Sequence, residues 1–195
     1  MKLPAIIITV VIILIVVFNT FYKISEYEQA IITQFGKPIG GAVTRAGLHV
    51  KVPFIHTLHR FEKRILIWDG SADQIPTAGK KYIWLDTTAR WKIVDPLLFY
   101  QSVGNITGAM TRLDDIIDSA ARDIISSHLL IEAVRNTNHI LEQEPMDPEE
   151  SEEVETVLER IEMGREELTK YILTIARELV PQYGIELLDV QIKRI

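Results

Sequence analysis

The amino-acid sequence predicts an α+β fold behind an N-terminal transmembrane helix, and three observations support this. The first 22 residues are almost continuously apolar, the next segment alternates apolar and polar residues with a period of two, and the last part repeats apolar residues at steps of three and four. Strands followed by helices and a final strand are typical of the α+β class. The 195 residues suit one globular domain with an appendage.

The apolar segment at residues 3–22 is 20 residues long and carries no charge. As a helix it spans ~30 Å, the thickness of a hydrocarbon core. A cleaved signal peptide is the alternative, but the apolar run is longer than usual for one and no small-x-small cleavage site follows. We therefore expect a transmembrane anchor over residues 1–23. Lys2 on the short N-terminal side favours a cytoplasmic N-terminus.

Strands are predicted over residues 27–35, 48–52, 58–68 and 82–94. The first has apolar residues on both faces, so both faces are expected to be covered. Pro53 ends the second strand, and Asp95 with Pro96 stops the fourth. These segments contain no long helical pattern, which predicts an antiparallel sheet.

The second half of the domain is predicted to be helical at residues 106–127, 129–134 and 154–180. Four charged residues form the polar side of the first helix: Asp114, Asp118, Arg122 and Asp123. Gly164 is expected to weaken or bend the third helix at a cost of ~1 kcal/mol. Pro181 and Gly184 end it, and residues 185–195 alternate as a last strand.

The charge distribution argues against nucleic-acid binding. Residues 142–155 hold eight acidic residues and no basic one, and with Pro145 and Pro148 they predict a solvated loop. Removing these eight from the 27 acidic residues leaves 19, against 21 Lys and Arg, so the rest is nearly neutral and predicts no basic face. The chain has no cysteine, which excludes disulfides, thiolate zinc sites and a cysteine nucleophile.

No motif predicts a catalytic, cofactor-binding or metal site. His56 and His59 are three residues apart but lack the glutamate of an HExxH motif, so a structural role is favoured over zinc. The glycine-flanked residues 104–108 lack the Lys-Ser/Thr of a phosphate loop. Asp114 and Asp115 are neighbours on a predicted helix and point ~100° apart, so they do not share one site. The chain is therefore expected not to be an enzyme.

Several short motifs occur in one order behind the predicted anchor. They are EQA at 28–30, FGK at 35–37, AGLH at 46–49, PF at 53–54, WKI at 91–93, DP at 95–96, AARDIIS at 120–126, GIE at 184–186 and DVQIKRI at 189–195. With these motifs the chain resembles the SPFH/band 7 family, which includes stomatin, prohibitin, flotillin and bacterial HflK and HflC, and it is most similar to the HflC type. The resemblance covers nearly the whole chain and implies an SPFH/band 7 domain over residues 24–195.

The sequence departs from the family in three places. Residues 77–80 read TAGK where the family often has a Thr-Lys-Asp turn, and the acidic loop is an insertion relative to stomatin that HflC-type members share. The family's C-terminal coiled coil is absent after residue 195. We therefore expect a fragment of a longer protein or a short member.

The resemblance implies a membrane-anchored scaffold without catalysis of its own. Such a subunit is expected to oligomerise with itself and an HflK-like partner and to modulate FtsH, a membrane AAA+ protease. It is expected in the bacterial inner membrane as a single-pass protein with its domain on the periplasmic side. Assembly is expected to use exposed strand faces around Trp84 and Trp91 and the charged faces of the helices. Two alternatives remain open: a stomatin-like membrane organiser, and a membrane-tethered hydrolase subunit using His56, His59 or a serine.

Overall fold

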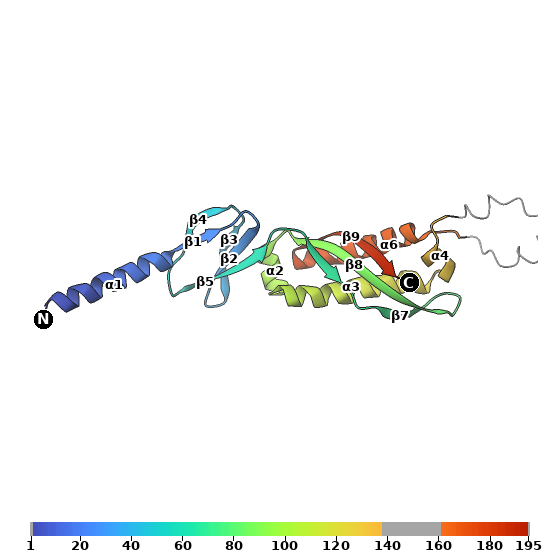
Figure 1. Ribbon diagram of the computed structural model, residues 1–195, viewed down its shortest axis with the longest axis horizontal. Helices are drawn as coiled ribbons and strands as arrows, with labels where there is room; N and C mark the ends of the chain where they lie inside the picture. The colour runs from blue at the N-terminus through green and yellow to red at the C-terminus, as the bar shows by residue number, and fades with distance from the viewer. Residues whose placement is uncertain (1, 138–160, 195) are drawn as a thin grey trace, which may run out of the picture. The chain divides into compact units, whose positions relative to one another are not determined.

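A computed structural model describes residues 2–137 and 161–194 of the chain (Figure 1). The predicted acidic loop at 142–155 lies outside these residues. The chain divides into two compact units. Unit 1 comprises Met1–Leu66, Lys92–Asn105 and Gln182–Glu186, and unit 2 comprises Ile67–Trp91, Ile106–Pro181 and Leu187–Ile195.

Unit 1 begins with helix α1, Lys2–Thr20, which leads directly into strand β1, Phe21–Ile24. The expected helix over residues 3–22 is therefore two residues too long at its end. The carbonyl oxygen of Thr20 accepts a hydrogen bond from the Lys51 amide at 2.8 Å, and β1 then pairs with β4, Gly47–Val50. Among the described residues, no helix has the length and apolarity that crossing a membrane requires. The transmembrane anchor stays a prediction.

A three-stranded antiparallel sheet forms the rest of unit 1, in the order β3–β2–β5. Its strands are β2 at Glu28–Gln34, β3 at Lys37–Val43 and β5 at His56–Glu62. On one face, Ala30 of β2 packs with Tyr22 and Ile24 of β1. On the same strand, the side chain of Gln29 is buried and donates to the carbonyl of Ile93 at 2.9 Å. Both faces of β2 are covered, as its sequence predicts.

Helix α2, Pro96–Ser102, is an element that the sequence reading missed. Asp95 and Pro96 do stop the strand expected over residues 82–94, but Asp95 also caps the helix, because its carboxylate accepts from the amides of Leu97 and Leu98 at 3.0 Å each. Pro96 occupies the first turn, where the absence of its N–H costs nothing. Phe99 of this helix is fully buried and packs edge-on against Phe61.

Unit 2 contains most of a second antiparallel sheet, in which β6 and β7 pair with β8 and β9 pairs with β8 as well. The strands are β6 at Leu66–Asp69, β7 at Asp73–Pro76, β8 at Tyr82–Ile93 and β9 at Ile185–Arg194. The single strand expected over residues 58–68 is wrong, because β5 and β6 are separate. The break follows Glu62: the Lys63 amide bonds to the carbonyl of Tyr27, and Arg64 folds back onto Glu62.

Three helices complete unit 2: α3 at Ile106–Ser126, α4 at Leu130–Val134 and α6 at Arg165–Leu179, followed by the 3-10 turn η2 at Val180–Tyr183. In Figure 1, α3 and α6 run alongside β8 and β9, and their apolar stripes pack against each other. The helix expected over residues 154–180 is wrong at 161–164. Gly164 is extended and caps α6, and a Cβ there would lie 2.5 Å from the carbonyl oxygen of Asn136.

A buried carboxylate joins α4 to the start of α6. Glu132 accepts from the amides of Leu129 at 3.0 Å, Glu162 at 3.0 Å and Met163 at 3.4 Å. Burial alone raises the pKa of Glu132, but these three donors outweigh it and hold the pKa below its usual value. The Arg165 amide also bonds to the carbonyl of Arg135. The structure thus confirms an α+β fold with antiparallel sheets.

Candidate functional site

The two histidines singled out in the sequence make contacts within unit 1. The Nδ1 atom of His56 accepts from the Val52 amide at 3.2 Å. The ring of His59 lies 3.1 Å from the Thr33 hydroxyl and packs against Tyr100. In the described part of the chain, no three potential metal ligands come together. The absence of catalysis remains a prediction, and the surfaces of the two units become the candidates for function.

The polar side of α3 is only partly covered: Asp114 and Asp118 are half-buried, whereas Arg122 and Asp123 are exposed. The indole N–H of Trp68 donates to Asp114, and Arg122 forms an ion pair with Asp73 of β7. Asp118 is half-buried between these residues, and its pKa is raised to about 6, first by burial and then by the charges of Asp114 and Asp73. These pairs join residues far apart in the sequence, so no local pattern indicates them.

The outer face of the β1–β4 pair is apolar and exposed. Phe21 lies opposite Val50, and Lys23 lies opposite Leu48. Because directly opposed residues of an antiparallel pair point to the same side, these four side chains share one face. Phe21, Leu48 and Val50 are 48%, 70% and 64% exposed. We call these four residues the ribbon face.

The ribbon face adjoins other exposed apolar residues of unit 1. The described apolar side chains of α1, from Ile6 to Phe18, are all exposed. The loop after β4 adds Val52, Phe54 and Ile55. Phe54 has a φ of 66°, in the left-handed region where a bulky residue is an outlier. A strained backbone that holds a phenyl ring in solvent indicates an interaction surface.

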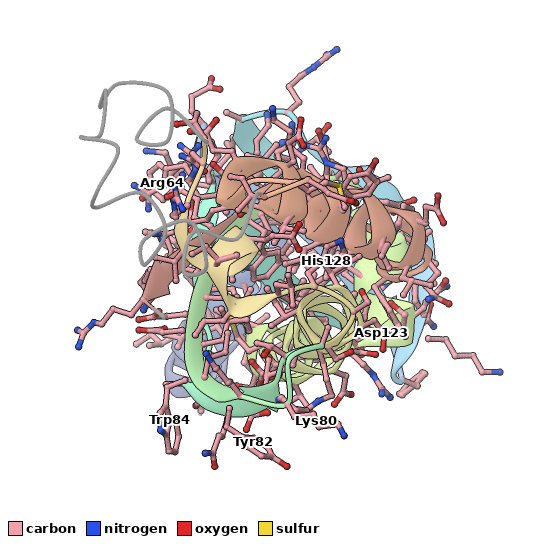
Figure 2. The ribbon with its side chains drawn as sticks, turned by 90° about the vertical axis from the view of Figure 1, so that its right-hand side faces the viewer. Arg64, Lys80, Tyr82, Trp84, Asp123 and His128 are labelled. Atoms are coloured by element: carbon pink, nitrogen blue, oxygen red, sulfur yellow. The ribbon has the colours of Figure 1, made fainter. Side chains whose placement is uncertain are left out.

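Strand β8 carries a second exposed aromatic patch, in unit 2. Figure 2 shows Tyr82 and Trp84 projecting away from the strand. Trp84 is 61% exposed and lies opposite Gln74 of β7. Trp91 is fully buried, because β8 alternates and its odd-numbered residues face the core. The expectation that Trp91 lies on an assembly face is therefore wrong, whereas Trp84 is available for one.

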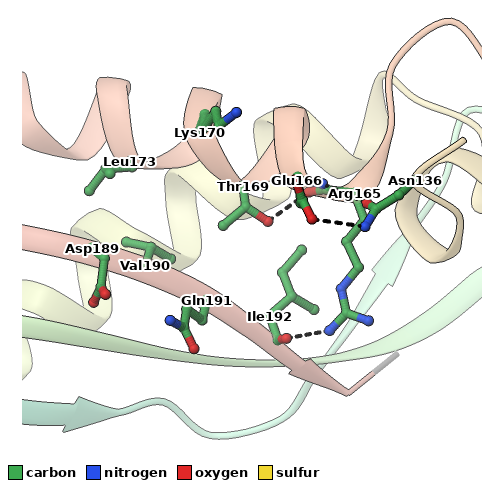
Figure 3. A pocket seen from close by; sticks show the side chains of 10 residues that line it. All are labelled: Asn136, Arg165, Glu166, Thr169, Lys170, Leu173, Asp189, Val190, Gln191 and Ile192. Atoms are coloured by element: carbon green, nitrogen blue, oxygen red, sulfur yellow. Dashed lines mark hydrogen bonds between the residues drawn. The ribbon is translucent and has the colours of Figure 1, made fainter.

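A groove of ≈ 450 Å³ lies between α6 and β9 (Figure 3). Thr169, Lys170 and Leu173 of α6 form one wall, and residues 189–192 of β9 form the other. Arg165 spans one end and donates to the carbonyl of Ile192. At the other end of the contact Arg177 donates to the carbonyl of Leu187 at 2.9 Å. The sequence reading placed these residues on a helix and a strand but did not bring them together.

With the geometry established, comparison with known proteins identifies the family. A sequence profile of the SPFH domain / Band 7 family matches residues 22–195. The chain belongs to the SPFH/band 7 family. Among its SPFH/band 7 relatives, Protein HflC of Treponema pallidum is 39% identical over 190 residues, covering 93% of this chain and 57% of that protein.

Two further relatives are also HflC proteins by name. Protein HflC of Borreliella burgdorferi is 36% identical over 184 residues, which cover 92% of this chain and 56% of that protein. Modulator of FtsH protease HflC of Escherichia coli K12 is 32% identical over 100 residues, covering 49% of this chain and 30% of that protein. The chain thus spans somewhat more than half the length of the first two relatives. The family resemblance expected from the sequence is confirmed.

Proposed function

We propose that this chain is a membrane-anchored scaffold subunit that modulates an FtsH-type protease. The observation that carries the proposal is the exposed apolar surface at the start of unit 1. Only Asn19 and Thr20 separate Phe18, the last apolar residue of α1, from Phe21 of the ribbon face. Contiguous exposed apolar surface marks contact with a membrane or a protein.

In this proposal residues 1–23 are the anchor and residues 24–195 form the SPFH/band 7 domain. Lys23 flanks the apolar side chains of the ribbon face, and a lysine in such a place extends its ammonium group to the headgroup layer. The N-terminus would lie in the cytoplasm and the domain on the periplasmic side of a bacterial inner membrane. Tethering raises the effective concentration of subunits, which favours assembly with other copies and an HflK-like partner.

The proposal of a protease as the partner rests on the names of the relatives. One of them is called a modulator of FtsH protease, and the sequence offers no catalytic motif of its own. A scaffold would act through surfaces, and the exposed patch at Tyr82 and Trp84 is suited to this because aromatic residues are enriched in interfaces.

Crosslinking in native membranes tests this proposal. The tagged full chain is crosslinked, solubilised and purified, and the attached proteins are identified by mass spectrometry. We expect an HflK-like subunit and an FtsH-type protease. Trp84→Ala should lower their recovery severalfold, whereas Tyr27→Ala, which removes an exposed aromatic ring from unit 1, should not. Recovery of ion channels in place of the protease would contradict the proposal.

A further inference from the structure

The β7–β8 hairpin presents a row of exposed side chains on one face of the unit 2 sheet. Odd-numbered residues of β8 face the core, so Tyr82 and Trp84 point outward, where they are 67% and 61% exposed. On β7, Gln74 lies opposite Trp84 and Pro76 lies opposite Tyr82, and directly opposed residues share a face. Figure 2 shows Lys80, Tyr82 and Trp84 projecting from the same side of unit 2. We call these five residues the hairpin face.

The hairpin carries a positive charge. Lys80 and Lys81 are the only charged residues of the sequence between Asp73 and Asp86. Both lysines are exposed, and within the described residues neither forms a salt bridge. Asp73 and Asp86 are each ion-paired with another cation, and the exposed carboxylate of Asp123 belongs to α3, on the core side of the sheet. A negatively charged occupant would complement the two lysines.

The backbone holds Lys80 in this place at a cost. Its φ is 57°, in the left-handed region that costs an L-residue ~1 kcal/mol. The Lys80 amide bonds to the carbonyl of Thr77 at 2.9 Å, and the hairpin tip is fixed to unit 2 because the Ala78 amide bonds to the carbonyl of His128 at 3.0 Å. A strained backbone that presents a charged side chain to solvent indicates a contact surface.

The sequence of the acidic segment at residues 142–155 has features that match the hairpin face. It has eight carboxylates and no cation, and Pro145 and Pro148 are three residues apart. The polyproline II helix has three residues per turn, so it places both prolines of a Pro-x-x-P sequence on one face. One turn rises ~9 Å, close to the ~7 Å between alternate residues of a strand. Pro-x-x-P segments dock on aromatic side chains, which Tyr82 and Trp84 supply.

The two ends of the acidic segment and the hairpin face lie on opposite sides of unit 2. The ends are held beside α6, since the Arg165 amide bonds to the carbonyl of Arg135 and the side chain of Asn136 bonds to Glu166. Figure 2 shows α6 on the side of the molecule away from the labelled tyrosine and tryptophan. Surfaces on opposite sides of one unit meet head-to-tail between two copies, which is the kind of contact that closes rings.

We propose that residues 142–155 of one copy bind the hairpin face of a second copy. The two prolines contact Tyr82 and Trp84, and the carboxylates approach Lys80 and Lys81. This inference deepens the proposed function and rests on it, because assembly with other copies is part of that proposal. The simpler reading is that the acidic segment is only a solvated spacer. That reading gives no role to two exposed aromatic rings beside two lysines that no described carboxylate neutralises.

The test uses introduced cysteines, because the chain has none of its own. One preparation of the full chain carries Gln74→Cys, opposite Trp84, and a second carries Met146→Cys, between the two prolines. The second also carries an affinity tag, so that the heterodimer differs in mass from either homodimer. The two are mixed in detergent micelles, oxidised with copper phenanthroline and separated on a non-reducing gel. The heterodimer yield should exceed by about fivefold or more that of a mixture in which Arg112→Cys, an exposed position on α3, replaces Gln74→Cys.

Further substitutions separate the aromatic and the charged parts of the contact. Trp84→Ala on the first copy, or Pro145→Ala with Pro148→Ala on the second, should lower the heterodimer yield by about tenfold with helix content unchanged. Lys80→Glu should lower the yield by about threefold or more, and so should added salt. Tyr27→Ala, which removes an exposed aromatic ring from unit 1, is the matched control and should leave the yield unchanged.

A heterodimer yield no higher than that of the Arg112→Cys mixture, or one that Trp84→Ala leaves unchanged, would overturn the proposal. So would a disulfide that forms within a single chain carrying both Gln74→Cys and Met146→Cys while the mixture gives no heterodimer, because the segment would then bind its own chain. The purified chain needs no protease in this experiment. Failure here, with the protease still recovered from native membranes, would therefore overturn this inference and leave the proposed function standing.

Discussion

At the scale of single residues, Asp118 couples the stability of the protein to pH. It is half-buried on α3, and its pKa of about 6 exceeds the value of 3.8 for a free aspartate, first because of burial and then because Asp114 and Asp73 are nearby. The folded state therefore binds this proton more tightly than the unfolded chain. Its contribution to stability is fully present below about pH 4 and is lost as the pH rises to about 6.

Asp118→Asn should consequently stabilise the protein at pH 7.5. Because the side chain is half exposed, solvent screening limits the gain to about 1 kcal/mol. Urea unfolding followed by tryptophan fluorescence at pH 4.5, 6 and 7.5 measures it, and the gain should shrink at pH 4.5. Asp123→Asn, an exposed carboxylate on the same helix, should change the unfolding free energy by less than about 0.5 kcal/mol. Equal gains at pH 4.5 and 7.5 would show that the carboxylate is not the cause.

At the scale of elements, two glycines with the same φ angle allow the cost of a left-handed backbone to be distinguished from the cost of a steric clash. Gly40 in β3 and Gly184 before β9 both have a φ of 70°. A Cβ on Gly40 would meet nothing within 4 Å, whereas one on Gly184 would lie 2.4 Å from the carbonyl oxygen of Asp95 and 2.8 Å from the amide nitrogen of Phe99. Gly184 therefore lets η2 and β9 pass close to the start of α2.

Gly40→Ala should cost about 1 kcal/mol of unfolding free energy, from the left-handed backbone alone. Gly184→Ala should cost at least about 3 kcal/mol, since backbone atoms that hold the cap of α2 must also move. Thermal and urea unfolding of the two variants side by side measures the difference. Similar losses for both would mean that the close approach at Gly184 relaxes at little cost.

Elements with strong local signals were predictable from the sequence. The periodicity of β2, β8, β9 and α3 places each within one or two residues of its observed bounds. Elements defined by tertiary contacts were not. Strand β1 exists because it pairs with β4, and α6 begins at Arg165 because the close approach of Asn136 requires Gly164. Short segments such as β7 carry too few residues for a period to be detected.

At the scale of the whole molecule, the tryptophans and the exposed apolar ribbon face lie in different units. All three tryptophans, Trp68, Trp84 and Trp91, belong to unit 2, whereas the ribbon face belongs to unit 1. A sequence reading finds each apolar residue but not which of them share a face, because that depends on pairs such as Phe21 with Val50. The α6–β9 groove was missed for the same reason, since its walls come together only in the fold.

This division leaves unit 1 without tryptophan emission of its own and allows a tryptophan reporter to be placed there. The emission of a Phe21→Trp variant, after subtraction of the wild-type spectrum, should shift to the blue with phosphatidylglycerol vesicles, because the indole leaves water for the interface. Tyr27→Trp, in the turn three residues beyond the end of β1, is the matched control and should shift little. An unshifted Phe21→Trp spectrum with vesicle-bound protein would remove the ribbon face from the proposed membrane contact.

The junction between α4 and α6 has a consequence for how sequences of this kind can change length. The amides of Glu162 and Arg165 bond to Glu132 and Arg135, so the two ends of the segment between residues 135 and 162 are held close together. The entropy cost of closing a loop grows only with the logarithm of its length, by ~0.6 kcal/mol for each doubling. A change in the length of the segment between these points should therefore change the closure entropy by little, so a reporter protein grafted there should leave the thermal unfolding of the protein nearly unchanged.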